Sequence, residues 1–141
     1  MTAKEYLEQI KEYETRIKQK QIQLECLRET AGGASGIRYD KERIQVSVMA
    51  DAVERAVITV MELEDQIFVE KVRLETLRAQ IITQIHDVGD DRYIKVLFKR
   101  YVEHKSYELI SVECHYSYDY VKELHSDALR SFAKIVDMEP I

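Results

Sequence analysis

Two stretches of the sequence space their apolar residues alternately three and four apart, and this pattern leaves the chain few possible folds. The stretches cover residues 3–30 and 53–81. A seven-residue apolar repeat is typical of helices that pack along a narrow seam, as in a coiled coil. The first seam is Tyr6, Ile10, Tyr13, Ile17, Lys20, Leu24 and Leu27, and the second is Val53, Ala56, Val60, Leu63, Ile67, Glu70, Leu74, Leu77 and Ile81.

Each seam has one charged interruption, Lys20 in the first and Glu70 in the second. If the two helices run antiparallel, one register sets Lys20 against Glu70 and gives each neighbouring apolar residue an apolar partner. A slip of one heptad would set each charge against an apolar side chain. We therefore expect the pair to fix the register more than to add stability.

These seams predict a long antiparallel helical hairpin, a coiled coil, over residues 1–88. Its second helix is expected to run from about residue 47 or 51 to His86. Glycine and serine are concentrated in residues 31–36 (AGGASG), which predicts a helix break and a connecting loop at about residues 31–46. The same seams could pair two chains instead, so a homodimer through the hairpin is an alternative use of this pattern.

Residues 91–135 predict three further helical segments, residues 91–105, 106–115 and 118–135. Ser106 and Ser117 stand where an N-cap is expected, because a serine hydroxyl accepts amide protons of the first helical turn. Gly89 is expected to take the left-handed conformation that ends the hairpin. The buried faces are expected at Tyr93, Val96, Leu97 and Tyr101, at Leu109 and Val112, and at Val121, Leu124, Ala128, Leu129 and Phe132.

The short break between the last two segments has the spacing of a helix-turn-helix. This module is expected at residues 89–136, followed by a tail at 137–141. The fold class predicted from the sequence is therefore all-α, with a long antiparallel hairpin followed by a C-terminal helix-turn-helix.

The C-terminal residues resemble the helix-turn-helix of sigma-factor region four. More closely, the chain resembles a family of small phage and prophage proteins related to the RinA and ArpU type transcriptional regulators. The resemblance implies a transcriptional regulator that binds double-stranded DNA, with RNA polymerase as a further partner. It rests on residues 1–7 (MTAKEYL), 49–53 (MADAV), Leu97, Tyr101, Val102, 106–111 (SYELIS), Tyr116, Ser117, Tyr120, Val121, Leu124, His125, Ala128 and Leu129.

In this interpretation the helix that starts after Ser117 enters a major groove. Two positions depart from the family pattern. His115 stands where such turns usually carry glycine, and Asp119 stands where a basic or neutral polar residue is more common. The expected DNA-binding residues are Ser117, Tyr118, Asp119, Lys122 and Ser126 at base edges, with Lys99, Arg100, Lys105 and Arg130 at phosphates.

Composition limits the possible functions. The net charge is −5, and residues 89–141 hold eight Lys or Arg against ten Asp or Glu, a net of −2. A general nucleic-acid binder needs a basic surface, so any DNA contact must come from a local patch. The chain has no apolar run long enough for a bilayer, no signal-peptide pattern and only two cysteines, so we expect a cytoplasmic protein without a membrane partner.

No enzyme, metal site or cofactor is expected. The four histidines do not share the spacing that places two ligands on one helix face, and no glycine-rich phosphate loop is present. The alternative function is a protein-binding adaptor or inhibitor, in which a degenerate helix-turn-helix and the hairpin hold a partner protein. For such a protein an acidic surface is no handicap.

Overall fold

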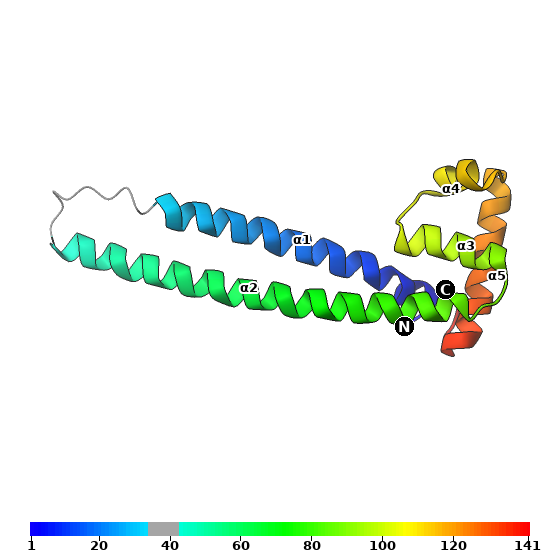
Figure 1. The fold of residues 1–141 in the computed structure, drawn as a ribbon, viewed down its shortest axis with the longest axis horizontal. Helices are drawn as coiled ribbons and strands as arrows, with labels where there is room; N and C mark the ends of the chain where they lie inside the picture. The colour runs from blue at the N-terminus through cyan, green and yellow to red at the C-terminus, as the bar shows by residue number, and fades with distance from the viewer. Residues whose placement is uncertain (34–42) are drawn as a thin grey trace. The chain divides into compact units, whose positions relative to one another are not determined.

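The computed structural model describes residues 1–33 and 43–141, and the side chains of residues 1–30 and 48–141. Within these ranges every regular element is a helix and no strand is present, so the predicted all-α class is confirmed. None of the helices in the described ranges is long and apolar enough to cross a membrane. In chain order (Figure 1) the elements are α1 (Ala3–Gly33), α2 (Arg43–His86), α3 (Asp91–Leu97), the π-helix η2 (Phe98–Val102), α4 (Tyr107–Cys114) and α5 (Tyr118–Val136).

The chain forms two compact units, and the two long helices contribute to both. One unit contains Met1–Glu14 with Arg73–Ile141, and the other is Thr15–Val72. This division does not test the domain boundary expected between residues 88 and 89, which stays a prediction.

In the unit of residues 15–72, segments of α1 and α2 contact each other along the expected seams. Ile17, Leu24, Leu63 and Ile67 are each less than one-tenth exposed. Lys20 Nζ lies 2.9 Å from Glu70 Oε1, and Arg28 forms an ion pair with Glu64. Lys20 pairs with Glu70, and Arg28, further along α1, pairs with Glu64, which is earlier in α2. The two segments therefore run in opposite directions.

The loop expected at residues 31–46 is wrong at both edges. α1 continues through Gly33, and α2 already begins at Arg43. Each glycine costs a helix only about 1 kcal/mol relative to alanine, so two at a helix end do not have to stop it. Residues 34–42 of the expected loop lie outside the described residues.

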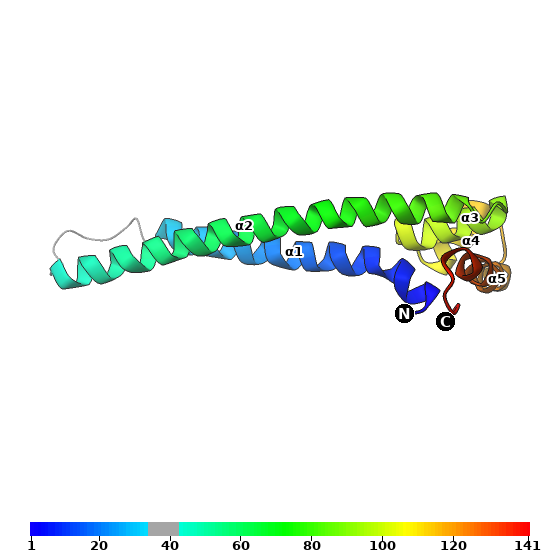
Figure 2. The ribbon, with the colours of Figure 1, turned by 90° about the horizontal axis from the view of Figure 1, so that it is seen from below.

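In the other unit, the beginning of α1 packs against the end of α2 and against α5. The Tyr6 ring stacks on Phe132 with centroids 6.2 Å apart, and its hydroxyl donates to Gln84 Oε1 at 2.7 Å. The backbone oxygens of Glu139 and Pro140 accept from the amides of Ala3 and Lys4, at 2.7 and 3.2 Å. The first amides of a helix have no partner within it, so the segment expected as a tail caps α1 and brings the two termini together (Figure 2).

Helices α3, α4 and α5 share one apolar core. Val96, Ile110, Val121 and Leu124 form its centre, and Tyr93, Tyr107, Cys114, Tyr116 and Tyr120 pack around them. The expected burial of Leu109 and Val112 is wrong, because these side chains are 44% and 69% exposed and Ile110 is buried instead. Helix α4 has only eight residues, so the spacing of its apolar residues is a weak guide to its buried side. The residue that it buries lies one position after Leu109.

Two local features shape the segment that precedes α4. The helix expected to reach Lys105 ends at Val102 in a turn of π-helix, where the amide of Glu103 donates to the carbonyl of Phe98 at 3.1 Å. His104 follows with φ of 58°, which stops the helix. The expected left-handed conformation of Gly89 is confirmed by its φ of 82°.

Candidate nucleic-acid interface

The start of α5 is held by a serine cap and by a left-handed turn. The Ser117 Oγ accepts from the amide of Tyr120 at 3.2 Å, and the Ser106 Oγ accepts from Leu109 at 3.2 Å at the start of α4. Between the two helices, His115 has φ of 58° and ψ of 38°. Histidine tolerates this conformation better than most residues other than glycine and asparagine, so the turn closes without glycine.

Helix α5 separates a buried face from an exposed face. Val121, Leu124, His125, Ala128, Leu129 and Phe132 are buried, whereas Asp119, Lys122 and Arg130 are exposed. Ser126 is half-buried and Tyr118 is 38% exposed. Five of the expected DNA-binding residues, Tyr118, Asp119, Lys122, Ser126 and Arg130, thus fall on the outward side of this helix at helical spacing.

The first turn of α5 is arranged around Tyr118. The Lys122 ammonium lies 4.8 Å from the centroid of the Tyr118 ring, and the same ring forms a T-shaped pair with Tyr107, with centroids 6.5 Å apart. A cation over an aromatic face is attracted to the ring electrons. Lys122 is therefore held near the beginning of the helix, three residues after Asp119.

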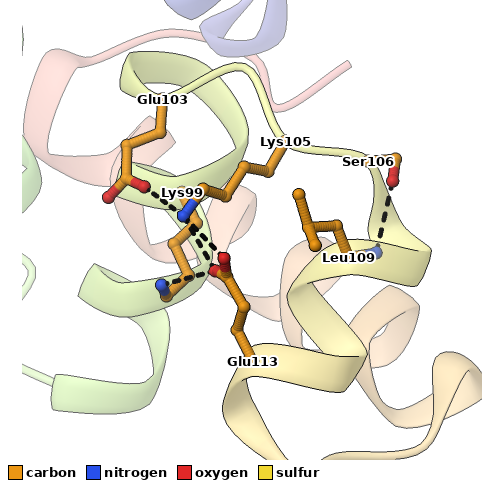
Figure 3. Close-up of polar contacts among 6 residues, drawn as sticks. All are labelled: Lys99, Glu103, Lys105, Ser106, Leu109 and Glu113. Atoms are coloured by element: carbon orange, nitrogen blue, oxygen red, sulfur yellow. Dashed lines mark hydrogen bonds and ion pairs between the residues drawn. The ribbon is translucent and has the colours of Figure 1, made fainter.

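Two of the expected phosphate-binding lysines meet a single carboxylate that sequence reasoning missed (Figure 3). Lys99 Nζ lies 2.8 Å from Glu113 Oε2, and Lys105 Nζ lies 2.9 Å from Glu113 Oε1. Lys105 also pairs with Glu103 at 2.6 Å. The side chains of Lys99, Lys105 and Glu113 are only 21%, 23% and 31% exposed, so the cluster is partly shielded from water.

The contacts in this cluster shift the pKa values of Glu113 and Lys105 in opposite directions. Hydrogen bonds from Lys105 and then Lys99 lower the pKa of the Glu113 carboxyl. Hydrogen bonds to Glu103 and Glu113 raise the pKa of Lys105. Glu113 and Lys105 therefore stay charged near neutral pH, and a phosphate would have to compete with Glu113 for both lysines.

The two arginines expected at phosphates have other partners. The Arg100 guanidinium donates to the carbonyl of Lys105 at 3.1 Å and lies 4.3 Å from the centroid of the Tyr107 ring. Arg130 pairs with Asp127 one turn earlier, at 3.2 Å. Lys99, Arg100 and Lys105 thus form one group around η2 and the following loop. Arg130 lies about 18 Å along α5 from Tyr118, at about 1.5 Å per residue.

Beneath this surface, His125 is enclosed by two tyrosines. Its Nε2 lies 2.6 Å from the hydroxyl of Tyr101, and its Nδ1 lies 3.4 Å from the hydroxyl of Tyr107. Burial lowers the pKa of His125 to about 4, and the positive charges of Arg100 and Lys4 act in the same direction. The imidazole is therefore neutral near pH 7 and is a structural polar group of the core.

Sequence reasoning missed Glu113 and the enclosure of His125 for a common reason, because their partners are distant along the chain. Glu113 is fourteen residues from Lys99 and eight from Lys105, beyond the one-turn spacing at which helical charge pairs are recognised. The only local signal was the cap at Ser106, which orients α4 and thereby directs Glu113 toward the preceding segment (Figure 3).

Two further observations describe the chemistry of this protein. Within the described ranges no three His, Cys, Asp or Glu residues are grouped so that they could hold a metal ion. Cys26 and Cys114 are both free thiols.

Comparison of the chain with models of known protein families, with curated proteins and with solved structures gives no match.

Proposed function

We propose that this protein is a DNA-binding transcriptional regulator of the phage or prophage type, in which α4 and α5 act as a helix-turn-helix. The observation that carries the proposal is the start of α5. A serine cap and a left-handed turn fix the helix, its inner face is buried, and its outer face presents Tyr118, Asp119 and Lys122. An α-helix fits the major groove of double-stranded DNA, so the exposed start of α5 is suited to bind DNA.

The charges around α5 make this a weak DNA binder on its own. Glu113 neutralises Lys99 and Lys105, and Asp127 pairs with Arg130. Phosphate contacts supply much of the affinity of DNA-binding proteins, so few free cations mean low affinity. Recruitment by RNA polymerase, the second proposed partner, would compensate for this weakness. The protein would then act by occupancy and recruitment, and in the cytoplasm.

For the long helices we propose an antiparallel coiled-coil hairpin that positions the helix-turn-helix. The opposite direction of the α1 and α2 contacts in residues 15–72 supports it, as does the burial of Leu24, Leu63 and Ile67 between charged neighbours. Pairing of two hairpins into a homodimer would present two helix-turn-helix modules to one operator. Half-sites about 34–36 Å apart are the usual spacing for such dimers.

The test is fluorescence anisotropy of the purified protein with labelled duplexes tiled across the intergenic regions next to its gene, at several salt concentrations. Saturable binding to one tile that weakens steeply with salt is expected, because phosphate contacts release counterions. Lys122→Glu should abolish this binding. Lys134→Glu is the matched control, because it makes the same charge change at the far end of α5 and should retain most of the affinity.

A second candidate, the protein-binding adaptor, is favoured by one specific observation. Leu109 and Val112 are 44% and 69% exposed on α4, where a DNA-binding module would face phosphates. Exposed apolar side chains that lie together are typical of protein contacts. The adaptor would form no salt-sensitive DNA complex at any tile. It would copurify with a stoichiometric protein partner, which Val112→Glu should remove and Lys122→Glu should leave in place.

A further inference from the structure

Helix α2 carries a second line of apolar side chains, on the face opposite its contacts with α1. Ile58, Met61 and Phe68 are 48%, 60% and 69% exposed. At 100° per residue they lie roughly 150° around the helix from Leu63 and Ile67, which are buried. Val57 and Val69 flank this line and are 46% and 45% exposed. These five residues are called the outer stripe.

The outer stripe has the dimensions of a helix-binding surface. Residues 57–69 extend about 18 Å along α2, which is more than three turns at about 1.5 Å per residue. Val57 and Ile58 lie four and three residues before Met61, and Phe68 lies seven residues after it, which are spacings at which one helix packs against another. Single exposed apolar residues are common on protein surfaces, but five large ones along one face of a helix mark an interaction site.

The charge within the outer stripe indicates what could cover it. Asp65 lies on the line between Met61 and Phe68, and Glu62 lies at its edge. Neither carboxylate has an ion-pair partner in the part of the chain that the structure describes, whereas neighbouring Glu64 pairs with Arg28. The basic residues Arg55 and Arg73 lie about 80° around the helix from Asp65, outside the line.

We propose that the outer stripe binds an amphipathic helix of a partner protein, with a lysine or arginine inside its apolar face to meet Asp65. Covering the stripe with a purely apolar helix would bury Asp65 without a counter-charge, which is costly. A second copy of α2 would be a poor occupant. Within residues 57–69 the same line in a second copy offers Asp65 only apolar side chains or the carboxylate of its own Asp65.

The proposal is independent of DNA binding by α5, and the full chain can test it with two synthetic peptides. Both are fluorescently labelled amphipathic helices with the same leucine face, and one has lysine and the other glutamate at the centre of that face. The expected result is saturable binding of the lysine peptide and about ten-fold weaker binding of the glutamate peptide. Asp65→Lys should invert this preference.

Two further variants separate the stripe from the rest of α2. Phe68→Ser should weaken binding of the lysine peptide at least ten-fold. Gln66→Ala, an exposed neighbour outside the line, should leave it unchanged. Phe68 is 69% exposed, so Phe68→Ser is expected to fold, which circular dichroism will check. Equal affinity for the two peptides, or a preference that Asp65→Lys leaves unaltered, would overturn the proposal. So would a dimer in sedimentation equilibrium that Phe68→Ser dissociates, because a second copy would then cover the stripe.

Discussion

Lys20 Nζ donates to Glu70 Oε1 over 2.9 Å, in a setting where both side chains are mostly buried, at 26% and 13% exposure. The second oxygen of Glu70, Oε2, is buried and has no hydrogen-bond partner among the described residues. Desolvation of two charges offsets most of the attraction between them, and here one oxygen gains nothing in return. The pair is therefore poorly suited to add stability and well suited to select one alignment of α1 with α2.

Replacing both members of this pair should separate stability from alignment. We expect Lys20→Leu with Glu70→Leu to unfold at equal or higher urea concentration than the wild type. Glu70→Leu alone should lose about 1–2 kcal/mol, because Lys20 is left without a counter-charge. In the double variant, disulfide trapping between cysteines at positions 24 and 67, with Cys26→Ser, should fall as slipped registers become populated. Unchanged trapping would show that the apolar residues alone set the register.

The buried histidine predicts a loss of stability in mild acid. His125 has a folded-state pKa of about 4, below its ordinary value of about 6.5, because of burial and then Arg100 and Lys4. Its contribution is complete above about pH 6.5 and is lost as the pH falls toward 4, because the unfolded chain binds the proton first. Urea titrations should show a loss of about 2 kcal/mol between pH 6.5 and pH 5.

His125→Gln is the variant that checks this assignment. Glutamine can also form a hydrogen bond with the Tyr101 hydroxyl but does not titrate, so stability should become nearly flat between pH 6.5 and pH 5. At pH 7 the variant should be less stable by about 1 kcal/mol, through poorer packing against the tyrosines. If the variant retained the slope of the wild type, the acid sensitivity would belong to other groups.

The features that could be predicted from the sequence are those that local chemistry determines. Ser106 and Ser117 are N-caps because a serine hydroxyl needs only the next helical turn as its partner. His115 takes the left-handed conformation because the turn after α4 has no room for a longer loop. The charged interruptions Lys20 and Glu70 are in contact, since both stand in long periodic seams.

The features that could not be predicted depend on contacts between distant residues. Leu109 and Val112 fit a helical period, yet the packing of α4 against α3 and α5 selects Ile110 for burial. The helix after Gly89 ends in a π-turn before Lys105, and no residue pattern signals this. The cap on α1 comes from Glu139 and Pro140, at the opposite end of the sequence.

Removal of one hydroxyl should test how far the cap at Ser117 supports α5. Ser117→Ala is expected to lower stability by about 1 kcal/mol, because the amide of Tyr120 loses its acceptor. Ser126→Ala is the matched control in the same helix, where alanine is the better helix former and stability should stay equal or rise slightly. Chemical denaturation of the three proteins gives the comparison, and equal losses in both variants would show that the cap has no special role.

The carboxylate of Glu113 should limit DNA binding if the regulator function is correct. Glu113→Gln removes the charge that holds Lys99 and Lys105, at 2.8 and 2.9 Å, and leaves the shape of the side chain almost unchanged. Lys99 would then be free and Lys105 would keep only its ion pair with Glu103, so up to two lysines could contact phosphates. The slope of log affinity against log salt should then steepen by up to about 1.8, since each contact adds about 0.9. Affinity at low salt should rise several-fold.

Glu29→Gln provides the control for this experiment, because it makes the same change in net charge at an exposed position on α1. If both variants strengthened DNA binding equally, the gain would come from net charge and Glu113 would have no specific role. If neither variant bound DNA at low salt while remaining folded, removing the Glu113 charge would not be enough to create a phosphate contact. The exposed Leu109 and Val112 would then become the surface to pursue, with a protein as the expected partner.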